Sequence, residues 1–178
     1  MNICVFCSGQ EVDGKYTKDA TELGRLIGSK GHTLVWGGSN GGLMRAVADA
    51  VQNAGGKIVG VSVEFLREKA RENADEMVVT KDLAERKELL LSRSDAIVVL
   101  PGGTGTLDEI GEVLERKKHR MYEKPVVVLN AANFYDGLRM QLQKMSEEGF
   151  LNGTVREYVF FAETPADAIA SIEKNAQQ

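Results

Sequence analysis

The stretch DAIVVLPGGTGTLDEI, residues 95–110, passes from an apolar run through a glycine-rich turn into an acidic segment. Val and Ile without polar alternation are typical of a strand that is covered on both faces. The glycines bring backbone N–H groups within reach of an anion, and the start of a helix adds partial positive charge. The stretch therefore predicts a buried parallel strand, a turn suited to an anion, and a helix beginning beside it.

Similar apolar runs recur along the chain, with segments of helical periodicity between most of them. The runs are NICVFC (2–7), HTLVWG (32–37), KIVGVSV (57–63), EMVVT (76–80), DAIVVLP (95–101), KPVVVLN (124–130) and a weaker EYVFFA (157–162). The helical segments are 16–30, 43–53, 82–92, 106–119, 134–148 and 165–175. This alternation predicts an α/β fold, a doubly wound parallel sheet flanked by helices in three layers. Because no linker divides it, we expect residues 1–178 to form a single domain.

The composition narrows the class of ligand. Of the 178 residues 43% are hydrophobic and 27% charged, and the formal net charge is -4, so no broad basic surface is expected. Extended binding to nucleic acid is therefore disfavoured, and a small-molecule ligand is favoured. The sequence has no run of 18 apolar residues and no charged N-terminal region ahead of a long apolar stretch, so we expect no membrane association and a cytoplasmic protein.

Cys4 and Cys7 form a C-x-x-C pattern, which is found in redox pairs and in half of some zinc sites. Both lie in the first apolar run, and neither a second cysteine pair nor a histidine pair completes a metal shell. We interpret them as small core residues. His32 and His119 are far apart in sequence, and we assign neither of them to a metal.

Glycine-rich turns follow two of the predicted strands, GGSNGG at 37–42 and PGGTG at 101–105. In an open α/β sheet, ligands bind in the crevice beyond the carboxyl ends of the strands. Neither turn matches the P-loop pattern, and no G-x-G-x-x-G follows the first strand. Either turn alone is equally explained as a tight connection. Two such turns at strand ends favour a phosphate-bearing ligand.

Two charged residues near these turns have alternative interpretations. Thr106 and Glu109 have the T-x-x-E spacing of a capping box, in which Glu109 would accept from the backbone N–H of Thr106. Glu109 is also placed on a helix that opens beside the anion turn, where a carboxylate has chemistry available. Arg86 and Lys87 either lie on a solvated helix face or reach the same crevice.

The sequence resembles the Lonely Guy (LOG) family of nucleoside 5′-monophosphate phosphoribohydrolases, whose members are often mislabelled lysine decarboxylases. The resemblance runs from Cys4 to about Phe150 and rests on CVFCSG, WGGSNGGLMRAVADAVQNAGGKIVGV, ERK, SDAIVVLPGGTGTLDEI, KPVVVLN, FYDGL and EEGF. Its most specific part is P-G-G-x-G-T-x-x-E, which stands here from Pro101 to Glu109.

The resemblance implies a Rossmann-like fold, a homodimer or higher homo-oligomer, and hydrolysis of a nucleoside monophosphate to free base and ribose 5-phosphate. Candidate substrates include cytokinin riboside 5′-monophosphate and AMP. It also implies catalytic roles for Arg86 and Glu109, and no metal or organic cofactor. The substrate-binding residues it implies are Gly38, Ser39, Gly42, Lys87, Gly102, Gly103, Thr104, Gly105 and Thr106.

The sequence departs from the family pattern at two places. Arg45 stands where glycine is common, and Leu83 and Ala84 replace the methionine and histidine of M-H-x-R-K. The second departure weakens the case for cytokinin nucleotides and leaves open a non-catalytic nucleotide-binding or sensing protein. The accepted base stays undetermined. For GEVLERKKHRMYEKP, residues 111–125, a subunit contact and an exposed basic helix are both open.

Overall fold

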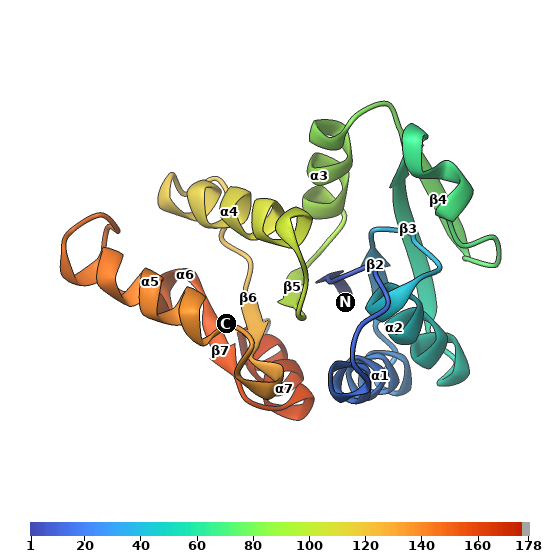
Figure 1. The fold of residues 1–178 in the computed structure, drawn as a ribbon, viewed down its shortest axis with the longest axis horizontal. Helices are drawn as coiled ribbons and strands as arrows, with labels where there is room; N and C mark the ends of the chain where they lie inside the picture. Colours follow the sequence, from blue (N-terminus) through green and yellow to red (C-terminus); the bar gives the residue numbers. More distant parts are fainter. Residues whose placement is uncertain (176–178) are drawn as a thin grey trace.

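The computed structural model describes residues 1–175 (Figure 1). In that range one parallel sheet is formed by β1 (Asn2–Phe6), β2 (Thr33–Trp36), β3 (Lys57–Val63), β4 (Glu76–Thr80), β5 (Ala96–Val99), β6 (Val126–Leu129) and β7 (Phe160–Ala162). The helices are α1 (Gly14–Ser29), α2 (Gly42–Asn53), η1 (Glu64–Lys69), α3 (Leu83–Ser92), α4 (Thr104–Lys118), η2 (Ala131–Asn133), α5 (Asp136–Glu147), α6 (Val155–Tyr158) and α7 (Pro165–Asn175). The predicted α/β fold with a parallel sheet is confirmed.

The strand order is β4-β3-β2-β1-β5-β6-β7. The chain winds outward from β1 in one direction through β4, then returns to place β5 on the other side of β1. This reversal between β1 and β5 is the point at which ligands bind in doubly wound sheets, beyond the carboxyl ends of the strands. The stretch DAIVVLPGGTGTLDEI, which contains β5, therefore begins beside the central strand β1.

Two hydrophobic cores cover the two faces of the sheet and complete the three layers. α1, α2 and α7 pack on one face, and α3, α4, α5 and α6 pack on the other (Figure 1). The central strand β1 contributes alternately to both cores, Ile3 and Val5 to the first and Cys4 and Phe6 to the second. This division explains why the strand sequences are apolar at successive positions.

Two predicted elements differ from those in the structure. The run EYVFFA was expected to be a strand, but Glu157 and Tyr158 belong to α6, which begins with a capping box formed by Thr154 and Glu157. α4 begins at Thr104, two residues before the predicted start, so the glycine-rich turn runs directly into the helix. Within residues 1–175, no helix is both long and apolar enough to cross a membrane.

Candidate active site

The two glycine-rich turns converge on the carboxyl end of β1. Leu100, at the end of β5, donates its N–H to the carbonyl of Phe6 at 2.9 Å. Beyond β1, Ser8 donates its N–H to Pro101 in the second turn, at 3.2 Å, and its carbonyl accepts from Met44 in α2, at 3.2 Å. Ser8 thus connects the second turn with the helix that follows the first, as expected at a reversal in strand order.

Arg86 and Glu109 form a buried ion pair beside these turns. Arg86 Nη1 donates to Glu109 Oε1 at 2.9 Å, and Arg86 Nε donates to the carbonyl of Val61 in β3 at 2.9 Å. The two residues are only 8% and 6% exposed. Arg86 therefore does not lie on a solvated helix face, and its guanidinium lies between β3 and the helix that follows the second turn.

Two residues next to Arg86 were not identified as its neighbours from the sequence. An added Cβ at Gly37 would lie 2.1 Å from Arg86 Nη2, so a side chain at position 37 would displace the guanidinium. The carbonyl of Val61, which accepts from Arg86 Nε, lies near the end of β3. The end of the run KIVGVSV marks this place in the sequence. The glycine after β2 and the carbonyl in β3 together fix the direction in which Arg86 points.

Glu109 has one oxygen committed to Arg86 and one available. Within residues 1–175, Oε2 has no hydrogen-bond partner, yet it is not an enclosed unsatisfied atom, so it retains contact with solvent. Burial raises the pKa of the Glu109 carboxyl above its usual value of 4.5, and the charge of Arg86 opposes this rise. The arrangement is a carboxylate poised to accept a proton or to face a developing positive charge.

The T-x-x-E capping box does not form. The N-cap of α4 is Gly103, no side chain caps the helix, and Glu109 contacts Arg86 instead of Thr106. In the described part of the chain, the backbone N–H groups of Thr104, Gly105 and Thr106 donate to no protein acceptor. Free N–H groups at the start of a helix, here one of 15 residues, are suited to binding an anion.

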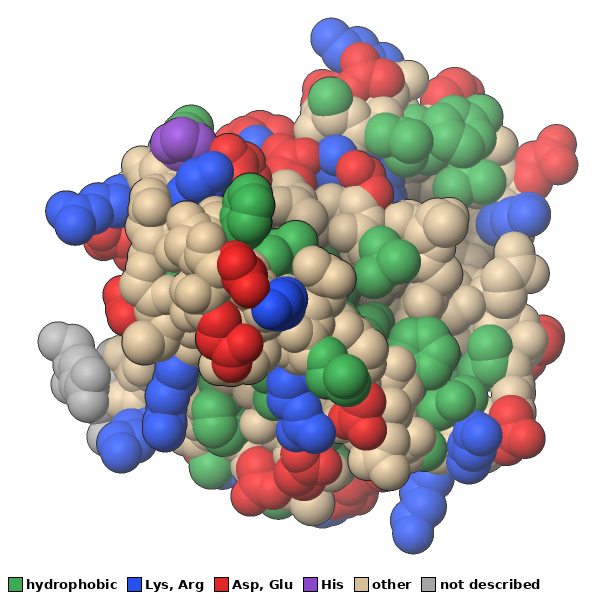
Figure 2. All heavy atoms as spheres, turned by 60° about the vertical axis from the view of Figure 1, so that its left-hand side comes forward, with side chains coloured by type: hydrophobic (Ala, Val, Ile, Leu, Met, Phe, Trp, Pro, Cys, Tyr) green, Lys and Arg blue, Asp and Glu red, His purple; other side chains and the backbone are tan. Residues whose placement is uncertain are grey.

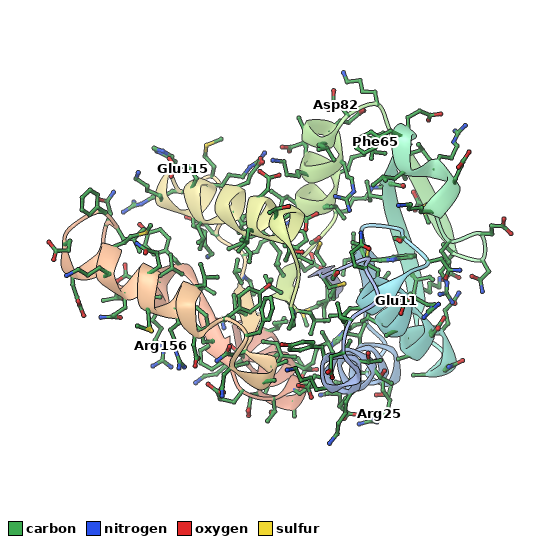
Figure 3. All side chains as sticks on the ribbon, in the orientation of Figure 1. Glu11, Arg25, Phe65, Asp82, Glu115 and Arg156 are labelled. Atoms are coloured by element: carbon green, nitrogen blue, oxygen red, sulfur yellow. The ribbon has the colours of Figure 1, made fainter. Side chains whose placement is uncertain are left out.

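The first glycine-rich turn differs because the N–H groups of Asn40 and Gly42 already have acceptors. Gly42 donates to Glu11 Oε1 at 3.2 Å, and the same carboxylate pairs with Arg45 at 3.0 Å. Glu11 lies in the loop after β1 beside the start of α2 (Figure 3). Asn40 donates its N–H to the carbonyl of Lys69. Of the two candidate anion turns, the first therefore has a carboxylate at the start of its helix, α2.

Gly38 and Ser39 connect this turn to the segment that follows β3. The carbonyl of Gly38 accepts from the N–H of Arg71 at 2.8 Å, and Ser39 forms an isolated antiparallel bridge with Ala70. A cavity of about 600 Å³ opens here. Its lining is Gly9, Gln10, Ser39, Asn40, Gly41, Glu68, Lys69, Ala70, Glu72 and Asn73, and does not include Arg86, Glu109 or the second turn.

Lys87 is not free to contact a ligand as the structure stands. Its Nζ lies 3.0 Å from Asp108 Oδ2 and 2.7 Å from Glu112 Oε2, on α4. Hydrogen bonds to Glu112 and Asp108 raise its pKa. Lys87 therefore attaches α3 to α4 beside the Arg86–Glu109 pair.

Cys4 and Cys7 are free and buried, in agreement with their interpretation as core residues. Burial raises the pKa of both thiols, which keeps them protonated and unreactive. Neither cysteine takes part in the site.

Comparison with known proteins gives matches over nearly the whole chain. A family model described as "possible lysine decarboxylase" matches residues 44–172. A cytokinin riboside 5′-monophosphate phosphoribohydrolase of Mycobacterium tuberculosis is 37% identical over 94% of this chain and 90% of its own. A probable enzyme of the same name from Oryza sativa subsp. japonica is 36% identical over 99% of this chain and 73% of its own.

The fold is also found among solved structures. The molybdenum cofactor binding protein of the phototrophic bacterium Rippkaea orientalis superposes with a TM-score of 0.78 and 24% sequence identity. The match covers 98% of this chain and 96% of that one. At this identity the likeness concerns the fold alone.

Proposed function

Because the chain belongs to the Lonely Guy family of phosphoribohydrolases, we propose that it hydrolyses the N-glycosidic bond of a nucleoside 5′-monophosphate. The products are the free base and ribose 5-phosphate. The relatives that carry the phosphoribohydrolase name match 94% or more of this chain, so the comparison includes both glycine-rich turns and the Arg86–Glu109 pair.

The observation that carries the proposal is the buried Arg86–Glu109 pair next to unpaired backbone N–H groups at the start of α4. The N–H groups of Thr104, Gly105 and Thr106 suit the three oxygens of a phosphate. Glu109 is two turns or less along the same helix. A nucleotide held by its phosphate at the helix start would bring its ribose towards the carboxylate.

Cleavage of the bond between C1′ and the base passes through an oxocarbenium-like transition state, in which positive charge builds on the ribose. Water adds its oxygen to C1′, the bonding electron pair leaves with the base, and a proton of the water is released. Glu109 either stabilises the charge on the ribose or takes the proton from the water. Arg86 orients Glu109 and assists in positioning the nucleotide or the leaving base.

The name of the matching family model suggests a lysine decarboxylase, which the residues of the site do not support. That chemistry uses pyridoxal phosphate on a lysine whose amine must be neutral to form a Schiff base. Lys87, beside the Arg86–Glu109 pair, has its pKa raised by hydrogen bonds to Glu112 and Asp108. Lys117 has its pKa lowered by burial, but it borders Val126 and Phe160 at the amino ends of β6 and β7, away from the site.

The base of the substrate is not assigned. Cytokinin riboside 5′-monophosphate and AMP are the candidate nucleotides. Leu83 and Ala84, which replace the methionine and histidine of the family pattern, open α3 three and two residues before Arg86. A polar cavity of about 600 Å³ beside Ser39 offers room for a purine. A panel of nucleoside monophosphates is therefore required.

The test incubates the protein with this panel and follows the free base by chromatography. Glu109→Gln keeps the size and a hydrogen-bond acceptor for Arg86 but removes the carboxylate, so kcat should fall on the order of 10²–10⁴-fold. Glu115→Gln is the matched control, because Glu115 lies on the outer side of α4 and pairs with His119 (Figure 3). If wild-type protein binds nucleotide but releases no base, the chain is a binding or sensing protein on this fold and the hydrolase proposal is wrong.

A homodimer or higher homo-oligomer is also part of the proposal. Met121, Met140 and Phe150 are 71–75% exposed and follow or lie on α4 and α5. The C-terminal ends of these two helices lie on the same side of the molecule (Figure 1). Large apolar side chains exposed on or after these two helices support a contact between subunits.

A further inference from the structure

The approach to the second glycine-rich turn depends on a buried hydroxyl group. Tyr135 is 2% exposed, and its Oη donates to the carbonyl of Leu100 at 2.8 Å. Leu100 is the last residue before the turn, and its N–H is bound to Phe6. Both backbone groups of Leu100 are thus fixed, one by β1 and the other by the tyrosine.

The same oxygen also contacts the turn itself. The backbone N–H of Gly102 lies close enough to this oxygen to oppose the rise in the pKa of Tyr135 that burial causes. The hydroxyl is therefore hydrogen-bonded to the backbone just before Pro101 and lies beside the backbone just after it. Gly102 immediately precedes Gly103, the N-cap of the helix whose free N–H groups form the anion site.

The segment between β6 and α5 holds Tyr135 in this position. Asn130 is 2% exposed, its Oδ1 accepts from the N–H of Tyr135 at 2.7 Å, and its Nδ2 donates to Asp136 Oδ1 at 2.9 Å. Between Asn130 and Tyr135, the backbone of Ala132 and Asn133 adopts left-handed conformations with φ of 50° and 61°. Such conformations are costly for residues other than glycine and persist where surrounding contacts require them.

We propose that Tyr135 is a positioning residue for phosphate binding, holding the backbone of Leu100 at the entry to the turn so that the N–H groups of Thr104–Thr106 face the phosphate. Removing the hydroxyl leaves the Leu100 carbonyl without its buried donor. The turn then relaxes, and the preorganised arrangement of N–H groups is lost. This inference rests on the proposed function for its substrate, although phosphate binding can be measured separately.

The chain offers a matched control in Tyr122. This residue is 7% exposed and belongs to the same hydrophobic core as Tyr135, but its buried hydroxyl has no partner within residues 1–175. Tyr122→Phe removes the same atom from a comparable environment without breaking a hydrogen bond. It should leave ligand binding unchanged and stability unchanged or slightly higher.

The experiment measures the Kd of ribose 5-phosphate by titration calorimetry for wild type, Tyr135→Phe and Tyr122→Phe, with circular dichroism to establish folding. Loss of the buried hydrogen bond to the Leu100 carbonyl should weaken binding to Tyr135→Phe about tenfold. KM for an accepted nucleotide should rise by a similar factor, with a smaller fall in kcat. Tyr122→Phe should match wild type in both.

The outcomes separate this inference from the hydrolase proposal. A folded Tyr135→Phe variant that binds ribose 5-phosphate as tightly as wild type, with only a lower Tm, gives Tyr135 a structural role alone and overturns the inference. Failure of wild-type protein to bind ribose 5-phosphate overturns it as well. If binding depends on Tyr135 but no nucleotide is hydrolysed, the inference stands and the hydrolase proposal is wrong.

Discussion

At the scale of single residues, Glu109 is subject to two opposing influences. Burial raises the pKa of its carboxyl above 4.5, and Arg86 acts in the opposite direction through its charge and its hydrogen bond. A carboxylate that accepts a proton from water must be ionised before the reaction. Activity should therefore be lost as the pH falls through the raised pKa of Glu109.

Replacing Arg86 isolates the effect of burial. In Arg86→Gln the opposing charge is absent, so the pKa of Glu109 should rise further and the acidic limb of the kcat/KM profile should move to higher pH. Where residual activity is too low, carbon-13 NMR of labelled glutamate carboxyl groups follows the same titration. An acidic limb that stays where it is in wild type would contradict the coupling between the two residues.

Arg116→Gln supplies the control for this titration. Arg116 also lies on α4 and pairs with Glu88 and Glu112, but no contact joins it to Glu109 within residues 1–175. Its replacement removes a positive charge of the same kind from α4, the helix that carries Glu109. The profile of Arg116→Gln should retain the acidic limb of wild type.

At the scale of elements, α1 and α2 approach each other through glycine. A Cβ added at Gly24 would lie 2.5 Å from the carbonyl oxygen of Val47 and 2.8 Å from the Cβ of Ala50. Both neighbours belong to α2, and the carbonyl is part of the helix backbone, so neither can move easily. The distance between the two helices therefore depends on the missing side chain.

Gly24→Ala should destabilise the protein by about 1–3 kcal/mol, the usual cost of forcing extra volume into a packed interior. Gly111→Ala is the control, because Gly111 lies inside α4 with no atom within 4 Å of an added Cβ. Alanine there should stabilise the helix by roughly 0.5–1 kcal/mol. Urea unfolding at one fixed protein concentration measures both. Equal free energies of unfolding for the two variants would show that the close approach is not required.

The elements were predictable to different degrees. Strands such as β3 and β5 are rich in Val and Ile and were located to within two residues at either end. α6 was missed because EYVFFA has a strand composition, although T-V-R-E before it is a capping-box signal. Conversely, the T-x-x-E at Thr106 gave a capping signal that the structure does not use, since α4 starts earlier and Arg86 attracts Glu109.

The site was only partly predictable for a related reason. Arg86 and Glu109 were identified by resemblance, but their contact spans 23 residues of sequence and depends on the strand order around β1. Local patterns carry no information about strand order. The carboxylate of Glu11 at the start of α2 and the hydroxyl of Tyr135 behind Leu100 likewise arise from tertiary structure.

At the scale of the whole molecule, the distribution of charged and apolar side chains on the surface bears on which partners the protein can bind. Charged side chains of both signs are interspersed with apolar ones over the face in Figure 2, and the formal net charge is -4. This face lacks the single-sign area that an extended nucleic acid requires.

The last prediction concerns the proposed homo-oligomer. Because Met140, on α5, and Phe150, just after it, are 71% and 75% exposed, charged replacements there should disrupt a subunit contact. Light scattering after gel filtration should give wild type at least twice its chain mass of 19.4 kDa, and Met140→Lys with Phe150→Lys a mass closer to 19.4 kDa. Phe65→Lys is the control, since Phe65 is 67% exposed but lies on η1 near β4 (Figure 3). A wild-type protein that stays at 19.4 kDa at every concentration would refute the oligomer, and a double variant with the wild-type mass would place the contact elsewhere.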